Sequence, residues 1–243
     1  MCGLTYQAAA VLLTKLGEAD LARIAAQRGL DAARRSGNTV VIGSLSRSVT
    51  HALLAAGRHR EAKHQAIDAA GLLERGLGGA SPTYLSVYGT LLLAGAMAAA
   101  RDGDRGTVRD LLAKADESAR RIGRDANHLW TAFGPTNVMI HRVATAVALG
   151  DVQVAVDLGP RVDTAGLPKE RRVRHMLETA QALTACDRTD EAVTTVLQAE
   201  RVAPEQVRNH VLSRRLVHSW MTRGRGKPDP QLAALAQRVR VAA

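Results

Sequence analysis

The chain has few aromatic residues: two Trp, three Tyr and one Phe among 243 residues. So few rings argue against a β-sandwich core and against platforms on which nucleobases stack. Cysteine is equally scarce, since only Cys2 and Cys186 are present, and their spacing matches neither a disulfide framework nor a metal-binding motif. This cysteine usage predicts a reduced, cytoplasmic setting.

Long hydrophobic runs are also absent. The first 16 residues lack the basic start of a signal peptide, and the apolar runs at 8–13 and 91–100 are too short to cross a bilayer. We therefore expect no signal peptide and no membrane association. The sequence has no recognisable pattern of metal ligands or of nucleotide-binding glycines, so it predicts neither a metal nor a cofactor.

Small apolar residues and positive charge are abundant. Ala, Leu and Val supply most of the 46% hydrophobic content, which is typical of helices that pack through small residues. The net charge of +10 suits an acidic partner such as nucleic acid, an anionic surface or an acidic protein segment. The competing interpretation is that most Arg residues only solvate the outer faces of helices.

A recurring corner, usually a Gly followed by polar residues, divides the chain into helix pairs. Apolar residues repeat at three- and four-residue steps around each corner, which indicates amphipathic helices. Gly can adopt the positive φ that ends a helix, and the Asp or Glu after it suits the next N-terminus. In the fifth corner we expect Cys186 at the position of the Gly. The corners lie at residues 16–20, 56–62, 101–105, 149–151 and 185–192.

Two second helices end alike, with A-A-R-R-S-G-N at 32–38 and S-A-R-R-I-G-R at 118–124, which supports an internal repeat. The A-P-E run at 203–205 begins a helix that we expect to continue to His218 or beyond. The sequence therefore predicts an all-α fold, a tetratricopeptide-like helical-hairpin solenoid of about five helix pairs plus C-terminal helices. We expect a repeat domain over residues 1–222, then a basic linker and a capping or dimerisation helix over 223–243.

One stretch carries a family resemblance. The run F-G-P-T-N at 133–137, with H-R-V at 141–143 and L-Q-A-E-R-V-A-P-E-Q-V-R at 197–208, resembles the C-terminal tetratricopeptide-like domains of actinobacterial transcriptional regulators. The resemblance implies a domain that binds a signal, a peptide or a partner. Those regulators usually carry a helix-turn-helix domain, and no such pattern is recognisable here. We therefore expect no direct DNA binding by this chain, as in a truncated relative or a stand-alone sensory domain.

The middle of the chain suggests a binding site. Trp130 and Phe133 precede a helix on which Asn137 and His141, four residues apart, share one face. A helical-hairpin solenoid offers a concave groove, so we predict a pocket wall with Asn137 and His141 as polar anchors. The structural alternative is that the two rings pack at a helix corner and that the polar side chains bond locally.

Neighbouring helices extend this predicted wall. Tyr84 and Tyr88 are four residues apart on the first helix of the preceding pair, although both would serve equally as core residues. On the following first helix, His175 and one of the adjacent Arg171 and Arg172 would add a cationic side for a carboxylate ligand. Adjacent residues point apart on a helix, and we assign Arg172 to the site.

Several functions stay open at this point. The leading hypothesis is a ligand- or peptide-sensing domain that binds a small molecule or peptide in the groove and signals through a protein partner. The alternatives are a scaffold that holds an acidic protein and an enzyme that uses His141 or His175 in acid–base catalysis. The apolar positions of Leu232, Leu235 and Val239 predict either a cap or the seam of a homodimer.

Overall fold

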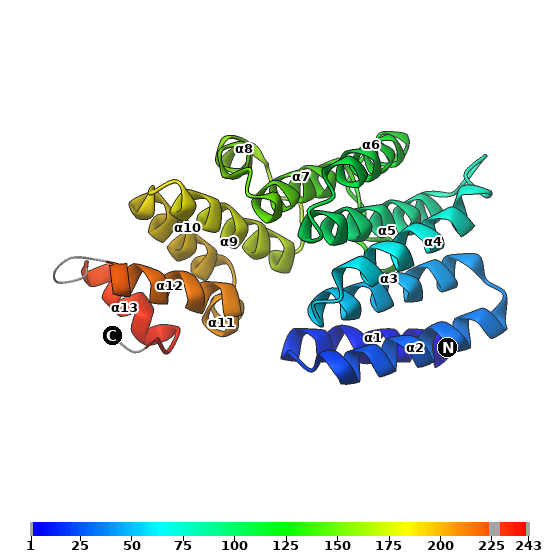
Figure 1. Cartoon of the computed structure of the whole chain (residues 1–243), viewed down its shortest axis with the longest axis horizontal. Helices are drawn as coiled ribbons and strands as arrows, with labels where there is room; N and C mark the ends of the chain where they lie inside the picture. The colour runs from blue at the N-terminus through cyan, green and yellow to red at the C-terminus, as the bar shows by residue number, and fades with distance from the viewer. Residues whose placement is uncertain (1, 224–228, 242–243) are drawn as a thin grey trace. The chain divides into compact units, whose positions relative to one another are not determined.

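The computed structural model describes residues 2–223 and 229–241, and within them the fold is all-α, as predicted (Figure 1). The one β feature in these residues is an isolated antiparallel bridge between Ala126 and Phe133. The α-helices are α1 (Cys2–Leu16), α2 (Ala19–Ser36), α3 (Thr39–Ala55), α4 (His59–Glu74), α5 (Pro82–Arg101), α6 (Arg105–Ile122), α7 (Pro135–Leu149), α8 (Val152–Leu158), α9 (Lys169–Ala185), α10 (Thr189–Val202), α11 (Pro204–Asn209), α12 (Val211–Arg223) and α13 (Pro230–Arg238), with 3₁₀ turns η1 (His128–Trp130) and η2 (Gly159–Arg161).

The chain divides into two compact units, Met1–Leu149 (unit 1) and Gly150–Ala243 (unit 2). The predicted repeat domain over residues 1–222 therefore includes parts of both units. The division predicted after residue 222 stays a prediction, because residues 224–228 of its basic linker lie outside the described residues. Each unit is described separately below.

All five predicted corners join two helices, and the residue with positive φ sits in the corner each time. In the fifth corner this residue is Asp187, with φ of 58°, whereas Cys186 has φ of −97° and caps α9. The expectation that Cys186 replaces the Gly was therefore wrong. Asp tolerates the left-handed region better than most residues because its short polar side chain can bond locally. The other corners use Gly17, Gly57, Gly103 and Gly150, with φ between 74° and 86°.

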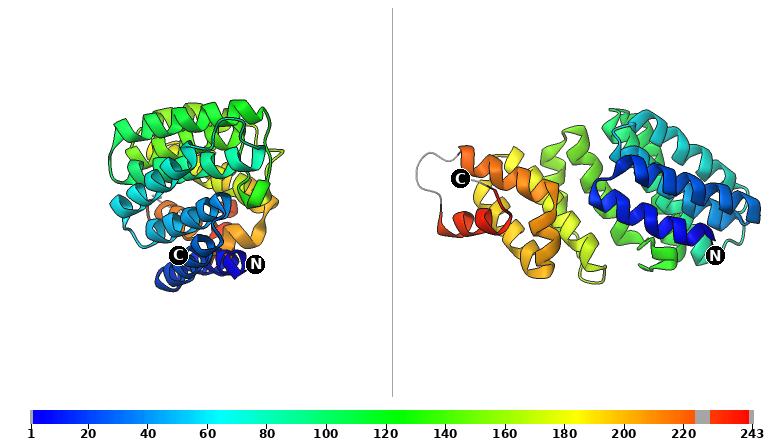
Figure 2. Two further views of the ribbon diagram at one scale, coloured as in Figure 1. Left: turned by 90° about the vertical axis from the view of Figure 1, so that its right-hand side faces the viewer. Right: turned by 90° about the horizontal axis from the view of Figure 1, so that it is seen from below.

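Unit 1 is built from stacked helical hairpins (Figures 1 and 2). The first helices α1, α3, α5 and α7 contact one another in order, and each second helix packs on its own hairpin partner and on the hairpin that follows. Helix α5 lies at the centre of this packing. It is the one described helix long and apolar enough to span a membrane, but 83% of that apolar window is buried inside the protein. Its apolarity is therefore that of a core helix.

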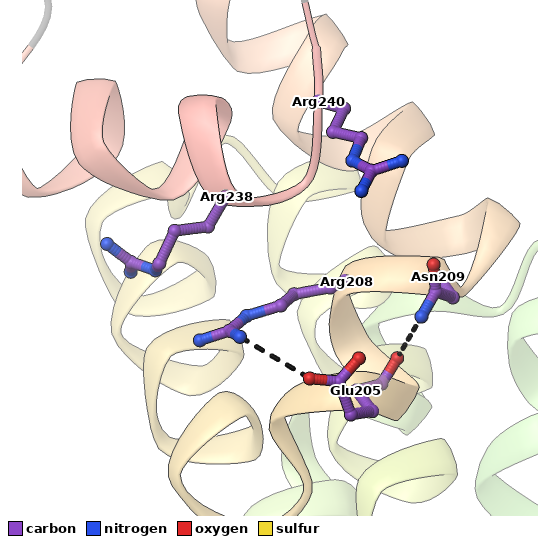
Figure 3. A pocket seen from close by; sticks show the side chains of 5 residues that line it. All are labelled: Glu205, Arg208, Asn209, Arg238 and Arg240. Atoms are coloured by element: carbon purple, nitrogen blue, oxygen red, sulfur yellow. Dashed lines mark hydrogen bonds and ion pairs between the residues drawn. The ribbon is translucent and has the colours of Figure 1, made fainter.

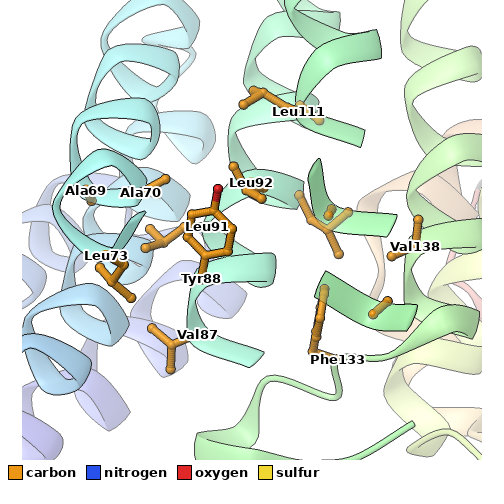
Figure 4. Close-up of a cluster of buried hydrophobic side chains, with 14 residues drawn as sticks. Ala69, Ala70, Leu73, Val87, Tyr88, Leu91, Leu92, Leu111, Phe133 and Val138 are labelled. Atoms are coloured by element: carbon orange, nitrogen blue, oxygen red, sulfur yellow. The ribbon is translucent and has the colours of Figure 1, made fainter. Parts of the chain in front are cut away.

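The core of unit 1 joins α4, α5, α6 and the start of α7 around Leu91, Leu92 and Phe133 (Figure 4). Small residues of α5 let its neighbours approach closely. At Gly95 an added Cβ would lie 3.1 Å from both the Ala66 Cβ and a methyl carbon of Leu111. At Gly89 the ring of Phe133 occupies the space that a side chain would fill.

Unit 2 contains the α9–α10 hairpin, with α8 and α11 packed on α9. The helix expected from residue 204 through His218 is instead two helices, α11 and α12, and this expectation was wrong. His210 interrupts it with an extended backbone (φ −78°, ψ 130°). Its Nδ1 accepts a hydrogen bond of 3.1 Å from the Leu212 N–H, which satisfies one of the free donors at the start of α12.

The C-terminal helix α13 packs on α12 of unit 2. The Asp229 carboxylate accepts hydrogen bonds from the backbone N–H groups of Gln231 and Leu232, which begins the helix. The side chains predicted as either cap or homodimer seam are buried within the chain itself. Their burial favours the capping interpretation, and the homodimer stays a prediction. They are Leu232, Leu235 and Val239.

Candidate functional site

The loop that joins α6 to α7 has an unusual backbone. Leu129, Trp130 and Ala132 have φ of 48°, 56° and 46°, in the left-handed region that side chains with a Cβ disfavour by about 1–2 kcal/mol each. Two of these are large residues without the short polar side chain that makes this region tolerable. A backbone of this kind persists only where surrounding interactions hold it.

Interactions at both ends of the loop hold this conformation. Ala126 N–H donates to the Phe133 carbonyl over 3.0 Å, and the Ala132 N–H donates to Asn127 Oδ1 over 3.0 Å. His128 Nδ1 lies 3.2 Å from Thr83 Oγ1 of α5. The loop is thus closed on itself and attached to the helix beside it.

The two aromatic residues of this loop lie in different environments. Phe133 is fully buried against Gly89 of α5, whereas Trp130 is 68% exposed. The predicted wall therefore does not form from both rings together: Phe133 belongs to the core, and Trp130 presents its side chain to solvent.

The predicted polar anchors are on the first turns of α7. Asn137 is fully buried, and neither its Oδ1 nor its Nδ2 has a hydrogen-bond partner among the described residues. His141 is half-buried, and its Nδ1–H donates to the Asn137 backbone carbonyl over 2.8 Å. This bond within one helix turn is the local alternative that the sequence also allowed.

Tyr84 and Tyr88 bind residues near the end of α4. The Tyr84 hydroxyl donates to the Leu73 carbonyl over 2.8 Å, and the Tyr88 hydroxyl donates to Glu74 Oε1 over 3.0 Å. Lys114 of α6 also donates to Glu74 over 2.7 Å. The Lys114 hydrogen bond, followed by that of Tyr88, lowers the pKa of Glu74, while burial is the main cause of the raised pKa of Tyr88. Both hydroxyl groups thus join helices inside unit 1.

The last two predicted site residues belong to unit 2. His175 is buried, and its Nε2–H donates to the Gly159 carbonyl over 2.9 Å while its Nδ1 has no partner in the described part of the chain. Burial lowers the pKa of His175, so the ring is held neutral. Arg172 is half-buried, and its Nε also has no partner there.

The surface of unit 2 has a basic concavity that we did not predict. It has a volume of about 350 Å³ and lies between α11 and the end of α13 (Figure 3). We call it the arginine concavity. Its sequence signal is the charge of residues 201–243, which hold nine Lys or Arg against two Asp or Glu. The lining residues are Glu205, Arg208, Asn209, Arg238 and Arg240.

A buried carboxylate organises the arginine concavity. Glu200 of α10 is 8% exposed and accepts hydrogen bonds from Arg238 Nε (2.8 Å) and Nη2 (2.7 Å) in a two-pronged ion pair. Arg208 Nε donates to the same carboxylate over 3.2 Å. The Arg238 hydrogen bond, more than any other interaction, lowers the pKa of Glu200. Arg240, at φ of 57° just beyond α13, is exposed and has no ion pair in residues 2–223 and 229–241.

The described residues also bear on metal binding. Within residues 2–223 and 229–241, no group of three or more His, Cys, Asp or Glu side chains is arranged to hold a metal ion. Of the predicted site residues, none lines the arginine concavity or a second shallow concavity beside it, between α10 and α13.

Comparisons with known proteins identify the fold. No family model matches the chain, and no curated protein matches it. Among solved structures, it is similar to a putative kinesin light chain from Podospora anserina with nearly identical TPR-like repeats. The identity is 18%, the TM-score is 0.52, and the match covers 84% of this chain and 95% of that one. At this identity the likeness shows the fold alone: the chain has a tetratricopeptide-like helical repeat fold. The relation to actinobacterial regulators stays a prediction.

Proposed function

We propose that this chain is a protein-interaction scaffold that binds an acidic partner through the arginine concavity and the basic surface around it. The observation that carries the proposal is the charge of residues 201–243 together with the concavity that three Arg side chains of this segment line. Helical repeats use extended surfaces for binding, and a scaffold needs no nucleophile, metal or cofactor. The proposal keeps the cytoplasmic setting predicted from the cysteine usage.

The arrangement of charges supports an acidic partner in particular. Glu200 already neutralises part of the charge of Arg208 and Arg238 and fixes their positions, which reduces the entropy lost when a ligand binds. Arg240, together with Arg214 and Arg215 of α12, is exposed. Exposed guanidinium groups recognise carboxylates through paired hydrogen bonds. An acidic segment would therefore meet Arg208 and Arg238 in fixed positions and Arg240 with its charge available for pairing.

The test is binding of a fluorescein-labelled peptide of 12 Glu residues, followed by fluorescence anisotropy at low and high salt. We expect saturable binding that weakens as salt screens the charges. The variant Arg240→Glu, at an exposed residue that lines the concavity, should weaken binding by about fivefold, because like charges oppose association. The matched control is Arg28→Glu on the exposed face of α2, which should leave the affinity within about twofold. Equal loss in both variants, or tighter binding of a duplex DNA of equal charge, would contradict the proposal.

Ligand sensing in unit 1 is a second candidate, and one observation favours it. The buried amide of Asn137 has no partner among the described residues, and buried polar groups are almost always paired in native proteins. A small molecule or peptide that reaches this amide would supply the missing hydrogen bonds. Native mass spectrometry of the wild type and of Asn137→Leu tests this. A bound molecule retained only by the wild type would support sensing, whereas higher stability of the variant without any bound molecule would refute it.

A further inference from the structure

Trp130 differs from every other aromatic residue in the described chain. Its side chain is 68% exposed, whereas the other five rings are buried or half-buried. Exposed Trp is uncommon on a surface that serves only solubility, and Trp is the residue most enriched at the energetic centres of protein interfaces. An exposed Trp in a chain with six aromatic residues is therefore a candidate for recognition.

The backbone holds Trp130 in this position. Leu129 on one side packs against the core of unit 1, and Phe133 on the other side is buried in the same core. Thr131 Oγ1 donates to the His128 carbonyl over 2.7 Å between them. A flexible loop could fold its Trp onto nearby apolar surface, but this loop is fixed at both ends with Trp130 pointing outward. A loop backbone that already holds its side chain toward solvent loses little conformational freedom when that side chain binds.

The charges on the adjoining segments indicate which partner fits. Arg124 precedes the loop and Arg75 directly follows α4, and both are exposed and form no ion pair within residues 2–223 and 229–241. Arg121 connects the two segments, because its Nη2 donates to the Leu77 carbonyl over 2.7 Å. The nearby carboxylate of Asp125 accepts a hydrogen bond from the Thr136 N–H. With Arg75, Arg121 and Arg124 against the single carboxylate of Asp125, the net charge of these segments is positive.

We infer that Trp130 is a binding anchor for a peptide segment of another protein in which an apolar side chain is flanked by carboxylates. The ring would bury the apolar residue, and Arg75 and Arg124 would pair with the carboxylates. A second copy of this chain fits less well, because residues 1–149 hold 18 Lys or Arg against 12 Asp or Glu and would repel one another. This site is in unit 1 and does not depend on the arginine concavity of unit 2.

Two labelled peptides test the inference on the full chain. One has two central Leu residues with five Glu on each side, and the other has 12 Glu. We expect the Leu-containing peptide to bind at least fivefold more tightly, because only this peptide can cover the indole ring. In a Trp220→Phe background, Trp130 is the sole Trp. Its emission should shift to shorter wavelength with the first peptide only, as the ring leaves water.

Variants separate an anchor from a general effect of charge. Trp130→Ala should abolish the preference for the Leu-containing peptide, while Trp130→Phe should restore most of it. Arg124→Gln should weaken binding of that peptide several-fold. The matched control is Val211→Ala, which removes an exposed apolar side chain from unit 2 and should change nothing. Weaker 12-Glu binding in the Arg240→Glu variant, with the preference for the Leu-containing peptide kept, would support two independent sites.

Two results would overturn the inference. One is equal binding of both peptides to the wild type, which would mean that no apolar contact contributes. The other is an unchanged preference in Trp130→Ala with a wild-type circular dichroism spectrum, which would place the contact elsewhere. Because Trp130 is exposed, its replacement is not expected to unfold the chain, and the spectrum checks this directly.

Discussion

Replacement of Gly89 by Ala is a sharp test of the core, because its expected effect opposes the usual trend. Gly inside a helix is normally less favourable than Ala by about 1 kcal/mol, so the substitution should stabilise α5. At this position, however, the added Cβ would overlap three atoms of the Phe133 ring. The ring is fully buried and attached to the strained α6–α7 loop, so it has little room to move.

The magnitude follows from two limits. If the ring shifts slightly within the core, overpacking destabilises the protein by about 1–3 kcal/mol. If the ring leaves its site, the loss approaches the roughly 3–5 kcal/mol of a Phe-to-Ala change. The gain of about 1 kcal/mol in helix propensity offsets part of either value. The two limits meet near 2 kcal/mol after this offset, so we expect Gly89→Ala to lower the free energy of unfolding by about 2 kcal/mol.

Urea and thermal unfolding followed by circular dichroism measure this effect. A loss of this size corresponds to a fall in Tm of about 4–8 °C for a unit of this length. The matched control is Gly71→Ala in α4, where an added Cβ meets no atom within 4 Å. It should raise the stability by about 0.5–1 kcal/mol. If Gly89→Ala also stabilised the protein, the close packing of Phe133 on α5 would be refuted.

Two pH-dependent predictions concern unit 2. Arg238 and Arg208 lower the pKa of Glu200, so its contribution to stability is complete above about pH 4.3, the unfolded value, and is lost as the pH falls through the lower folded value. Glu200→Gln should lower the urea midpoint at pH 7, and below pH 4 the midpoint of this variant should fall less with decreasing pH than that of the wild type. Burial lowers the pKa of His175, so the unfolded chain takes up the proton first and stability falls below about pH 6.5. His175→Gln, which keeps a donor for the Gly159 carbonyl, should reduce the loss of stability between pH 7 and 5. If either variant kept the pH dependence of the wild type, the stated residue would not be the cause of that dependence.

The helical hairpins were predictable from sequence because their corners depend on local chemistry. A residue with positive φ is needed where each first helix ends, and Gly supplies it at four corners. Asp187 takes this role in the fifth corner, and because this corner has no Gly, the role was predicted for Cys186, one position earlier. The break at His210 was missed because its neighbours continue a helical pattern of apolar residues and no Gly or Pro marks the interruption.

The candidate sites were harder to predict because they depend on contacts between distant residues. Periodicity places Phe133 near a helix start, but its burial follows from Gly89, 44 residues earlier. The exposure of Trp130 follows from a backbone that no local propensity favours. The arginine concavity requires Glu200 to hold both Arg208 and Arg238. Only the excess of positive charge in the C-terminal segment was visible in the sequence.

The scarcity of aromatic residues and the binding proposals are connected through packing. Small side chains bring the first helices of unit 1 close together, and Phe133 and Tyr88 fill the space that remains in this core. Tyr84 and Tyr88 also use their hydroxyl groups to join α5 to α4. Since these rings stabilise the fold, the surfaces that we propose for recognition lie outside the core, at Trp130 and at the arginine concavity. One is apolar with basic neighbours and the other is charged, so variants of one should leave binding at the other unchanged.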